Sequence, residues 1–251
     1  DNAGSDPRVA AGQNLRFEPT LSGDYTITLR VTQTDDSIFE CTFLARVRQP
    51  GLRVETCWDT TGQDDVDLWV HRPNTTGDWA KQNSETCYYA NCKNTNANSV
   101  DWDFEPTQGG AGGEPVGGAC KNPRLDIDNQ NTAGVPENIN VDVPRSGETY
   151  RVALNLYAKR STGGDIHPMV NLYCGGELKA TFGGAEVAGT LYGSSAITGF
   201  NTAGKDASGS LWRVADVAMQ SADTCNIRPL VPVGGDGACV ITGTDRSYSG
   251  Q

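Results

Sequence analysis

The sequence lacks the motifs from which several kinds of site are built. It has only two histidines, His71 and His167, and no Cys-x-x-Cys pair, so the usual zinc-ligand spacing is missing. Neither histidine accompanies a Gly-x-Ser-x-Gly motif, and the glycine-rich run 109–113 lacks the Lys-Ser/Thr of a phosphate-binding loop. We therefore expect that the chain is not an enzyme. A hydrolase with an unrecognised pair of carboxylates is the alternative, because acids are abundant.

Long apolar runs, excess positive charge and helical periodicity are missing as well. No run of apolar residues is long enough to span a membrane, so no membrane span is predicted. The chain has 31 acidic and 20 basic residues and a net charge of −11, which disfavours nucleic acid as a partner. Residue 1 is not methionine and no signal peptide is visible, so we expect a processed chain.

Short alternating segments, separated by turns rich in Gly, Asn, Thr and Ser, predict an all-β protein. The expected strands are 25–32, 39–47, 52–58, 65–71, 138–143, 147–157, 170–174, 177–182, 211–217, 226–233 and 239–242. Their spacing favours a β-sandwich of jelly-roll or immunoglobulin-like type. Residues 74–123 form a long insert in this pattern, and its three cysteines suggest that disulfides staple it.

The chain has eight cysteines, an even number, which predicts four disulfides and an oxidising compartment. The pairings that we expect are Cys87 with Cys92 or Cys120, and Cys174 with Cys225. The protein would then be secreted or lie on the extracellular surface. Reduced, buried thiols are the alternative, which the polar surroundings of many of these cysteines disfavour.

The segment 124–138 has the pattern of a twelve-residue calcium loop. Counted from the first aspartate, the ligand positions 1, 3, 5, 7, 9 and 12 hold Asp126, Asp128, Gln130, Thr132, Gly134 and Glu137. Position 6 is Asn131 instead of glycine, and asparagine tolerates the left-handed conformation better than most residues. An Asx-rich surface turn without metal is the alternative.

Two further Asp-x-Asp pairs support a cation site. Asp65 and Asp67 share one face of an expected strand, whose other face carries Val66, Leu68 and Val70. Asp101 and Asp103 repeat the spacing. Carboxylates this close repel each other, and a hard cation such as Ca²⁺ would relieve the repulsion. A solvated acidic surface is the alternative.

The first part of the chain resembles the last hairpin of a polycystic-kidney-disease-type (PKD) immunoglobulin-like repeat. The resemblance covers residues 14–48 and is carried by Gly23, Tyr25, Ile27, Leu29 and Val31. It implies a partial domain over residues 1–48 that lacks the front half of the repeat. A strand edge left unpaired in this way can accept a neighbour's strand, so self-association through strand edges is expected.

From residue 52 onward the chain resembles a family of secreted bacterial β-sandwich modules. The resemblance is carried by Trp58-Asp59, Asp65-Val66-Asp67-Leu68, Cys87-Tyr88-Tyr89-Ala90-Asn91, Asn122-Pro123-Arg124-Leu125-Asp126-Ile127-Asp128 and Pro136-Glu137-Asn138. It implies a secreted β-sandwich over residues 52–251, with Asp65, Asp67, Asp126, Asp128 and Asn138 close together. The loop pattern and the aspartate pairs add the expectation that this module binds calcium. With Glu137 from the loop pattern, the expected Ca²⁺ ligands are Asp65, Asp67, Asp126, Asp128, Glu137 and Asn138.

These observations predict an extracellular structural or adhesive module, stabilised by calcium and disulfides, that belongs to a surface fibre or large surface protein. The alternative is a calcium-dependent carbohydrate-binding module that stacks glycans on aromatic side chains of the insert. Those side chains are Trp79, Tyr88, Tyr89 and Trp102, with Trp69 nearby. The insert aromatics are more simply explained as a small core of the insert itself.

Overall fold

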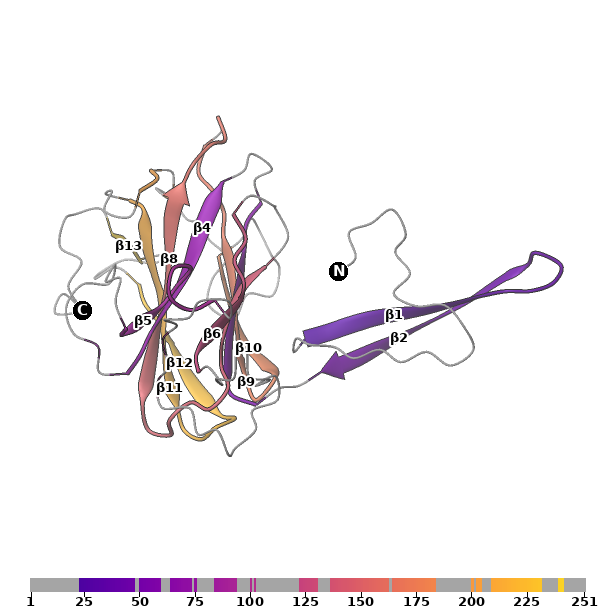
Figure 1. Cartoon of the computed structure of the whole chain (residues 1–251), viewed down its shortest axis with the longest axis horizontal. Coiled ribbons are helices and arrows are strands. Elements are labelled where there is room, and N and C mark those ends of the chain that lie inside the picture. The colour runs from indigo at the N-terminus through magenta and orange to yellow at the C-terminus, as the bar shows by residue number, and fades with distance from the viewer. Residues whose placement is uncertain are drawn as a thin grey trace. The chain divides into compact units, whose positions relative to one another are not determined.

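The protein is all-β, as a computed structural model of the chain shows (Figure 1). It divides into two compact units, Asp1–Gln49 and Pro50–Gln251. The structure describes residues 23–47, 50–59, 64–73, 75, 84–93, 100, 102, 122–130, 136–162, 164–183, 200, 202–204, 209–231 and 239–241. Within these ranges there is no helix, and hence none that is long and apolar enough to cross a membrane.

The described part of the first unit is a hairpin of β1 (Gly23–Thr32) and β2 (Ile38–Val47), which confirms the predicted strand pair. In the antiparallel register Leu29 lies opposite Cys41, so residues of both strands alternate together between two faces. One face carries only apolar side chains, namely Tyr25, Ile27, Leu29, Val31, Phe39, Cys41, Phe43 and Ala45. None of these side chains is buried.

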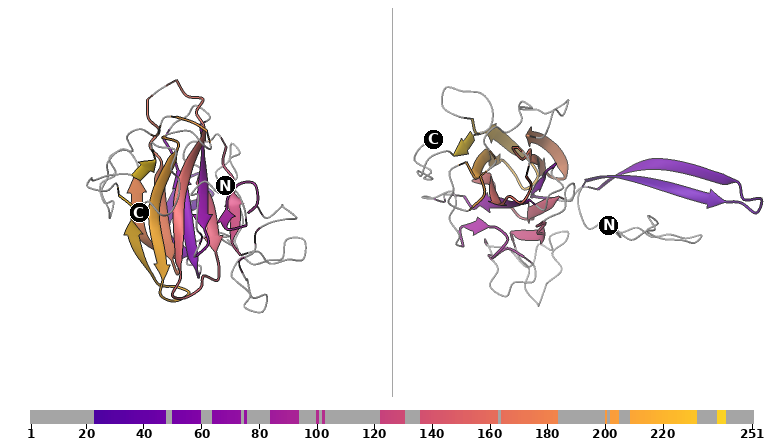
Figure 2. Two further views of the ribbon diagram at one scale, coloured as in Figure 1. Left: turned by 90° about the vertical axis from the view of Figure 1, so that its left-hand side faces the viewer. Right: turned by 90° about the horizontal axis from the view of Figure 1, so that it is seen from above.

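The second unit contains two antiparallel sheets that enclose a common core (Figures 1 and 2). The first has the order β10 (Glu177–Gly183), β9 (Met169–Cys174), β3 (Leu52–Cys57), β7 (Glu137–Val141), β6 (Arg124–Ile127). The second has the order β12 (Cys225–Pro229), β11 (Leu211–Met219), β8 (Thr149–Ala158), β4 (Asp65–His71), β5 (Thr86–Cys87), and β13 (Cys239–Ile241) also pairs with β11. The β-sandwich prediction is therefore confirmed at this level, while the jelly-roll or immunoglobulin-like subtype stays a prediction.

Strand β4 illustrates how the alternating pattern builds the core. Val66, Leu68 and Val70 are fully buried between the two sheets, as their spacing predicts. The opposite face of β4 is buried too, because Trp69 forms a second, smaller core with Tyr88, Ala153 and Leu211. The sequence pattern therefore identified the inner face of the strand, and the cover over its outer face was not predicted.

A disulfide and a glycine turn fix the connections of the first sheet. Gly175 and Gly176 join β9 to β10 with φ angles of 57° and 72°, which is the left-handed pair that a tight hairpin turn requires. Cys174 bonds Cys225, as predicted, and so links β9 to β12 of the other sheet. Because this bridge spans 51 residues, loop-closure entropy suggests that it stabilises the fold by about 4 kcal/mol.

The prediction of four disulfides is not met among the described residues. Cys87 bonds Cys92, which is one of the two partners expected for it. Cys41, Cys57 and Cys239 are free thiols. Cys120 lies outside the described residues. The even cysteine count therefore overestimated the number of bridges, because a count carries no information on which thiols meet in space.

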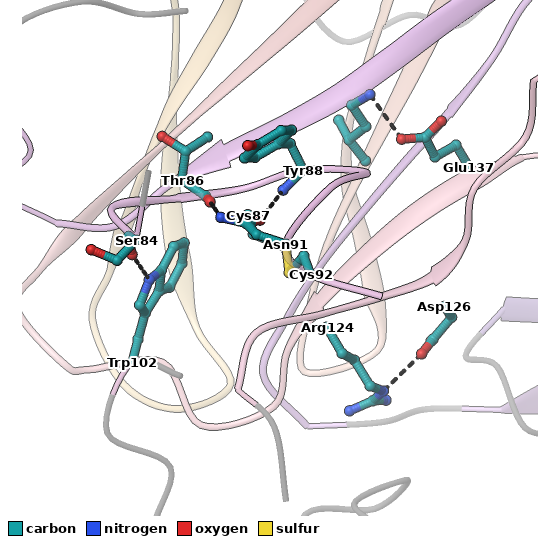
Figure 3. The surroundings of a disulfide bond; sticks show 11 residues. Ser84, Thr86, Cys87, Tyr88, Asn91, Cys92, Trp102, Arg124, Asp126 and Glu137 are labelled. Atoms are coloured by element: carbon teal, nitrogen blue, oxygen red, sulfur yellow. Dashed lines mark hydrogen bonds and ion pairs between the residues drawn. A yellow bond between two sulfur atoms is a disulfide. The ribbon is translucent and has the colours of Figure 1, made fainter. Parts of the chain in front are cut away.

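The described part of the insert is held by local bonds around the Cys87–Cys92 bridge (Figure 3). The Asn91 side-chain amide donates to the Thr86 carbonyl at 2.8 Å, and its oxygen accepts the Tyr88 N–H at 3.2 Å. Backbone bonds then join Cys92 to Leu125 of β6 at 2.8 Å. These bonds order residues 84–93 and connect β5 and β6, the edge strands of the two sheets, beside the predicted metal loop.

Candidate metal centre

The site begins with two aspartates on β4. Asp65 and Asp67 share the outer face of the strand, as the Asp-x-Asp spacing predicts. Their exposed fractions are only 5% and 3%, so these are buried carboxylates and not solvated surface groups. Burying a carboxylate is costly unless a cation or several hydrogen-bond donors compensate its charge.

Glu137, the first residue of β7, reaches the same place from the other sheet. Its Oε1 accepts the backbone N–H of Leu68 at 2.9 Å, as drawn in Figure 3. Strand β5 pairs with β4 only at Val70 and His71, so this bond satisfies an edge N–H beyond the end of β5. Glu137 is completely buried, and the bond to Leu68 fixes its carboxylate beside Asp67.

Asp128 completes a cluster of three carboxylates. Oxygen atoms of Asp67, Asp128 and Glu137 all lie within 4.8 Å of one another. One buried oxygen of each has no hydrogen-bond donor, namely Oδ2 of Asp67, Oδ1 of Asp128 and Oε2 of Glu137. Oδ1 of Asp65 is likewise buried without a donor. The protein thus gathers acceptor atoms whose hydrogen-bonding capacity its own donors leave unused.

The electrostatics of the cluster reflect this lack of compensation. Burial, together with the charge of Asp128, raises the pKa of Asp65 to about 6. Burial and the charges of Asp65 and Asp128 hold the pKa of Asp67 well above its usual range. Burial and the charge of Asp67 do the same to the pKa of Glu137, although its bond from Leu68 acts in the opposite direction. The cluster therefore favours either bound protons or a bound cation.

One lysine that the sequence did not suggest as part of the site contacts the cluster. The Lys93 ammonium forms an ion pair with Oδ2 of Asp128, and it lies 6.0 Å from the centre of the Tyr89 ring. No motif signals this contact, because Lys93 follows the Cys87–Cys92 bridge and is brought to Asp128 only by the pairing of Lys93 with Leu125. The charge of Arg160 also lowers the pKa of Asp65, so two positive charges act on four neighbouring carboxylates and leave them incompletely neutralised.

Asp126 and Asn138, which were also predicted as ligands, belong to a neighbouring network. Asp126 accepts bonds from Arg124 Nε at 2.8 Å (Figure 3) and from the side-chain amides of Asn138 and Asn140 at 3.2 and 2.5 Å. Arg124 also pairs with Asp142. Glu137 and Asn138 are consecutive in β7 and point to opposite faces. The predicted set is thus divided between two adjoining places.

The other predicted loop and insert residues are only partly described. Gln130 donates its side-chain amide to Asp128 at 3.3 Å. Asn131, Thr132 and Gly134 of the loop, and Trp79, Asp101 and Asp103 of the insert, lie outside the described residues.

Two aromatic residues of the insert are structural. Trp102 is 8% exposed, donates its Nε1–H to the Ser84 carbonyl at 2.9 Å and packs against Tyr150. Tyr88 is buried against Trp69. These contacts agree with the simpler explanation that the insert aromatics form a small core.

Comparison of the chain with protein-family models, curated proteins and solved structures finds no significant match. The resemblances to a PKD-type hairpin and to a secreted bacterial module therefore stay predictions, and the chemistry of the site rests on its geometry.

That geometry suits a hard divalent cation. The converging ligands are carboxylate oxygens, which calcium and magnesium prefer over nitrogen or sulfur donors. Calcium accepts six to eight oxygens in irregular arrangements, whereas magnesium requires a near-ideal octahedron. A cluster of oxygens from β4, the loop after β6 and the start of β7 is better matched to the more tolerant ion.

Proposed function

We propose that the chain is an extracellular structural or adhesive module whose β-sandwich is stabilised by Ca²⁺. The observation that carries this proposal is the convergence of Asp67, Asp128 and Glu137 oxygens within 4.8 Å, each residue retaining a buried oxygen without a donor. Calcium would replace the repulsion among these carboxylates with attraction. It would thereby join β4 of one sheet to β7 of the other.

The extracellular location is supported by the bridges Cys87–Cys92 and Cys174–Cys225, which persist in oxidising compartments. Extracellular fluids also hold free calcium at the millimolar concentrations that weak sites in extracellular modules require. Within the cluster, Asp67, Asp128 and Glu137 are the proposed direct ligands, and Asp65 adds a fourth buried carboxylate. Asp126 would hold β6 and β7 together by accepting hydrogen bonds from Arg124 and Asn138.

The adhesive part of the proposal rests on the β1–β2 hairpin. Within the described residues this sheet has two strands, each with one edge that no described strand pairs, and a hairpin alone is at best marginally stable in water. Its apolar face exposes Leu29, Val31, Phe39 and Phe43 by about half of their surface, at 46, 47, 60 and 52%. We propose that a second copy of the chain pairs with this hairpin. If light scattering of the dilute protein gives a monomer with and without calcium, this part of the proposal is wrong.

The test of the calcium proposal is thermal unfolding of the full chain in millimolar Ca²⁺, in millimolar Mg²⁺ and in EDTA. A ligand that binds only the folded state raises the melting temperature by mass action. We expect calcium, and not magnesium, to raise it in the wild type, and Asp67→Asn to remove the increase. Asp216→Asn is the matched control, because Asp216 is also buried but is paired with Arg151 and Arg228. Asp216→Asn should lower the melting temperature and keep the calcium increase.

A calcium-dependent carbohydrate-binding module is a second candidate, favoured by one observation. Tyr157 is 44% exposed and its ring lies 5.7 Å from that of Tyr89, whose pKa burial and the Tyr157 and Asp67 charges raise to about 12. The exposed Tyr157 ring, supported by the partly buried Tyr89, can stack a sugar ring. Glycan-array binding that requires calcium and is lost in Tyr157→Ala would support this candidate, and a silent array would favour the structural role.

A further inference from the structure

Lys93 is held against the carboxylate cluster by its backbone. Lys93 pairs with Leu125 in a short parallel bridge, and the Leu125 N–H donates to the Cys92 carbonyl at 2.8 Å. Cys92 is itself fixed by its disulfide to Cys87. The Cα of Lys93 is therefore anchored, and only its four-carbon side chain is left to move.

The ammonium group occupies a position where a metal ion would act on it. It contacts Oδ2 of Asp128, and its charge also opposes the rise in pKa of Asp65 and Asp67. The Lys93 side chain is 31% exposed, so solvent is within its reach. The Tyr89 ring, 6.0 Å from Nζ, offers a second resting place through a cation–π contact.

We propose that Lys93 is a tethered counter-cation that competes with Ca²⁺ for the cluster and thereby sets its calcium affinity. This inference rests on the proposed function. A divalent ion among Asp67, Asp128 and Glu137 repels an ammonium group in contact with one of them. Calcium binding therefore includes displacement of Lys93 toward solvent and the Tyr89 ring. Without calcium, Lys93 limits the repulsion among the carboxylates and supports the fold.

The test is isothermal titration of the full chain with CaCl₂. Lys93→Met keeps the length of the side chain and removes its charge, so we expect it to bind calcium about tenfold more tightly, or better. Lys93→Arg retains the charge and should stay within about threefold of the wild type. Lys179→Met is the matched control, because Lys179 is 30% exposed and pairs with Glu177 outside the cluster. Its affinity should equal that of the wild type.

Stability in EDTA separates competition from a merely structural role. Lys93→Met should melt below the wild type in EDTA, although it binds calcium more tightly, because it leaves the carboxylates without their counter-charge. If Lys93 only supported the fold, its substitution would lower both the melting temperature in EDTA and the calcium affinity. Equal or weaker calcium affinity in Lys93→Met overturns the inference while leaving a calcium-binding wild type intact. A wild type that takes up no calcium overturns the proposed function as well.

Acetylation of Lys93 in the wild type by an N-hydroxysuccinimide ester provides a second measurement that does not depend on any variant. Mass spectrometry of the peptide that contains Lys93 should show severalfold faster acetylation in calcium than in EDTA, because the displaced ammonium is more accessible. The peptide that contains Lys179 should be acetylated equally in both conditions. Equal rates for Lys93 would overturn the inference even where Lys93→Met fails to fold.

Discussion

Asp126 and Asp128 are two residues apart, but their carboxylates have different neighbouring charges and hydrogen-bond donors. Asp126 is bonded to the Arg124 guanidinium and to the side-chain amides of Asn138 and Asn140. Asp128 lies beside Asp67 and Glu137 and keeps a buried oxygen without a donor. Around Asp126 the protein supplies a cation and two amide donors for one carboxylate, whereas around Asp128 it supplies the Lys93 ammonium and three further carboxylates.

This difference indicates which acidic group performs a structural task and which is prepared for an external ion. The partly buried carboxylate of Asp126, which an arginine and two amides satisfy, is already compensated and has little to gain from calcium. A buried carboxylate among others of its kind remains costly until a proton or a cation arrives. The same loop therefore contains a charge-compensated network around Arg124, in which Asn138 Oδ1 is buried without a donor, and a cluster that a cation would complete.

The largest effect is expected when the Arg124 network is broken. Arg124→Met leaves the partly buried Asp126 and the buried Asp142 without their cation, which should lower the free energy of unfolding by about 3–5 kcal/mol. Because calcium is not part of this network, urea denaturation should give the same loss in calcium and in EDTA. The exposed Lys179–Glu177 pair is the control, and Lys179→Met should cost roughly 0–1 kcal/mol.

Glu137→Gln is the corresponding test of the cluster. Glutamine retains an oxygen for the Leu68 N–H and removes one buried charge, so stability in EDTA should stay equal or rise. The increase in the free energy of unfolding that calcium causes, called here the calcium increment, should be lost. In the wild type it is about 2.7 kcal/mol at a calcium concentration one hundred times the dissociation constant. Urea denaturation with and without calcium measures both quantities. A variant that retains the full increment would show that Glu137 is not a ligand.

Sequence patterns predicted most of the fold because strand alternation and turn residues are local signals. The hairpin around Leu29 and Cys41, strand β4 from Asp65 to His71 and the Gly175–Gly176 turn all have such local signals, and the structure confirms them. Strand β5 was missed because it has only two residues, which are held by the bond from Asn91 and by the Cys87–Cys92 bridge. Its sequence shows no alternation that would reveal it.

The site was predicted less completely because part of it depends on contacts between segments that are distant in sequence. The Asp-x-Asp spacing identified Asp65 and Asp67, and the loop pattern identified Asp128 and Glu137, because both patterns are local. Local spacing does not reveal which cations approach from elsewhere in the chain. The contacts of Lys93 with Asp128 and of Arg124 with Asp142 join segments far apart in sequence, and these contacts distinguish the cluster from its neighbouring network.

His71 extends the comparison to a buried group that needs no counter-ion. Burial and the charge of Arg151 lower its pKa to about 3, so it stays neutral in the folded protein. The unfolded chain binds a proton below pH 6.5 and the folded chain does not, so this group lowers stability as the pH falls from 6.5 toward 3. Between pH 6 and 4 the loss should be about 1.4 kcal/mol per pH unit relative to His71→Gln. Equal slopes in urea denaturation would contradict the neutral, buried histidine.

The smallest effect, and the sharpest test of the comparison, concerns the two aspartates themselves. Asp126→Asn keeps an acceptor for Arg124 and should lower stability by about 1 kcal/mol. Its calcium increment should match that of the wild type, whereas Asp128→Asn should lose most of it. Parallel calcium titrations of the two variants measure the difference.

If both lose the increment, all of the acids from Asp126 to Glu137 act as one calcium loop, and the division between cluster and network does not apply to metal binding. If only Asp128→Asn loses it, the bonds from Arg124, Asn138 and Asn140 explain why an aspartate in a ligand position remains outside the site.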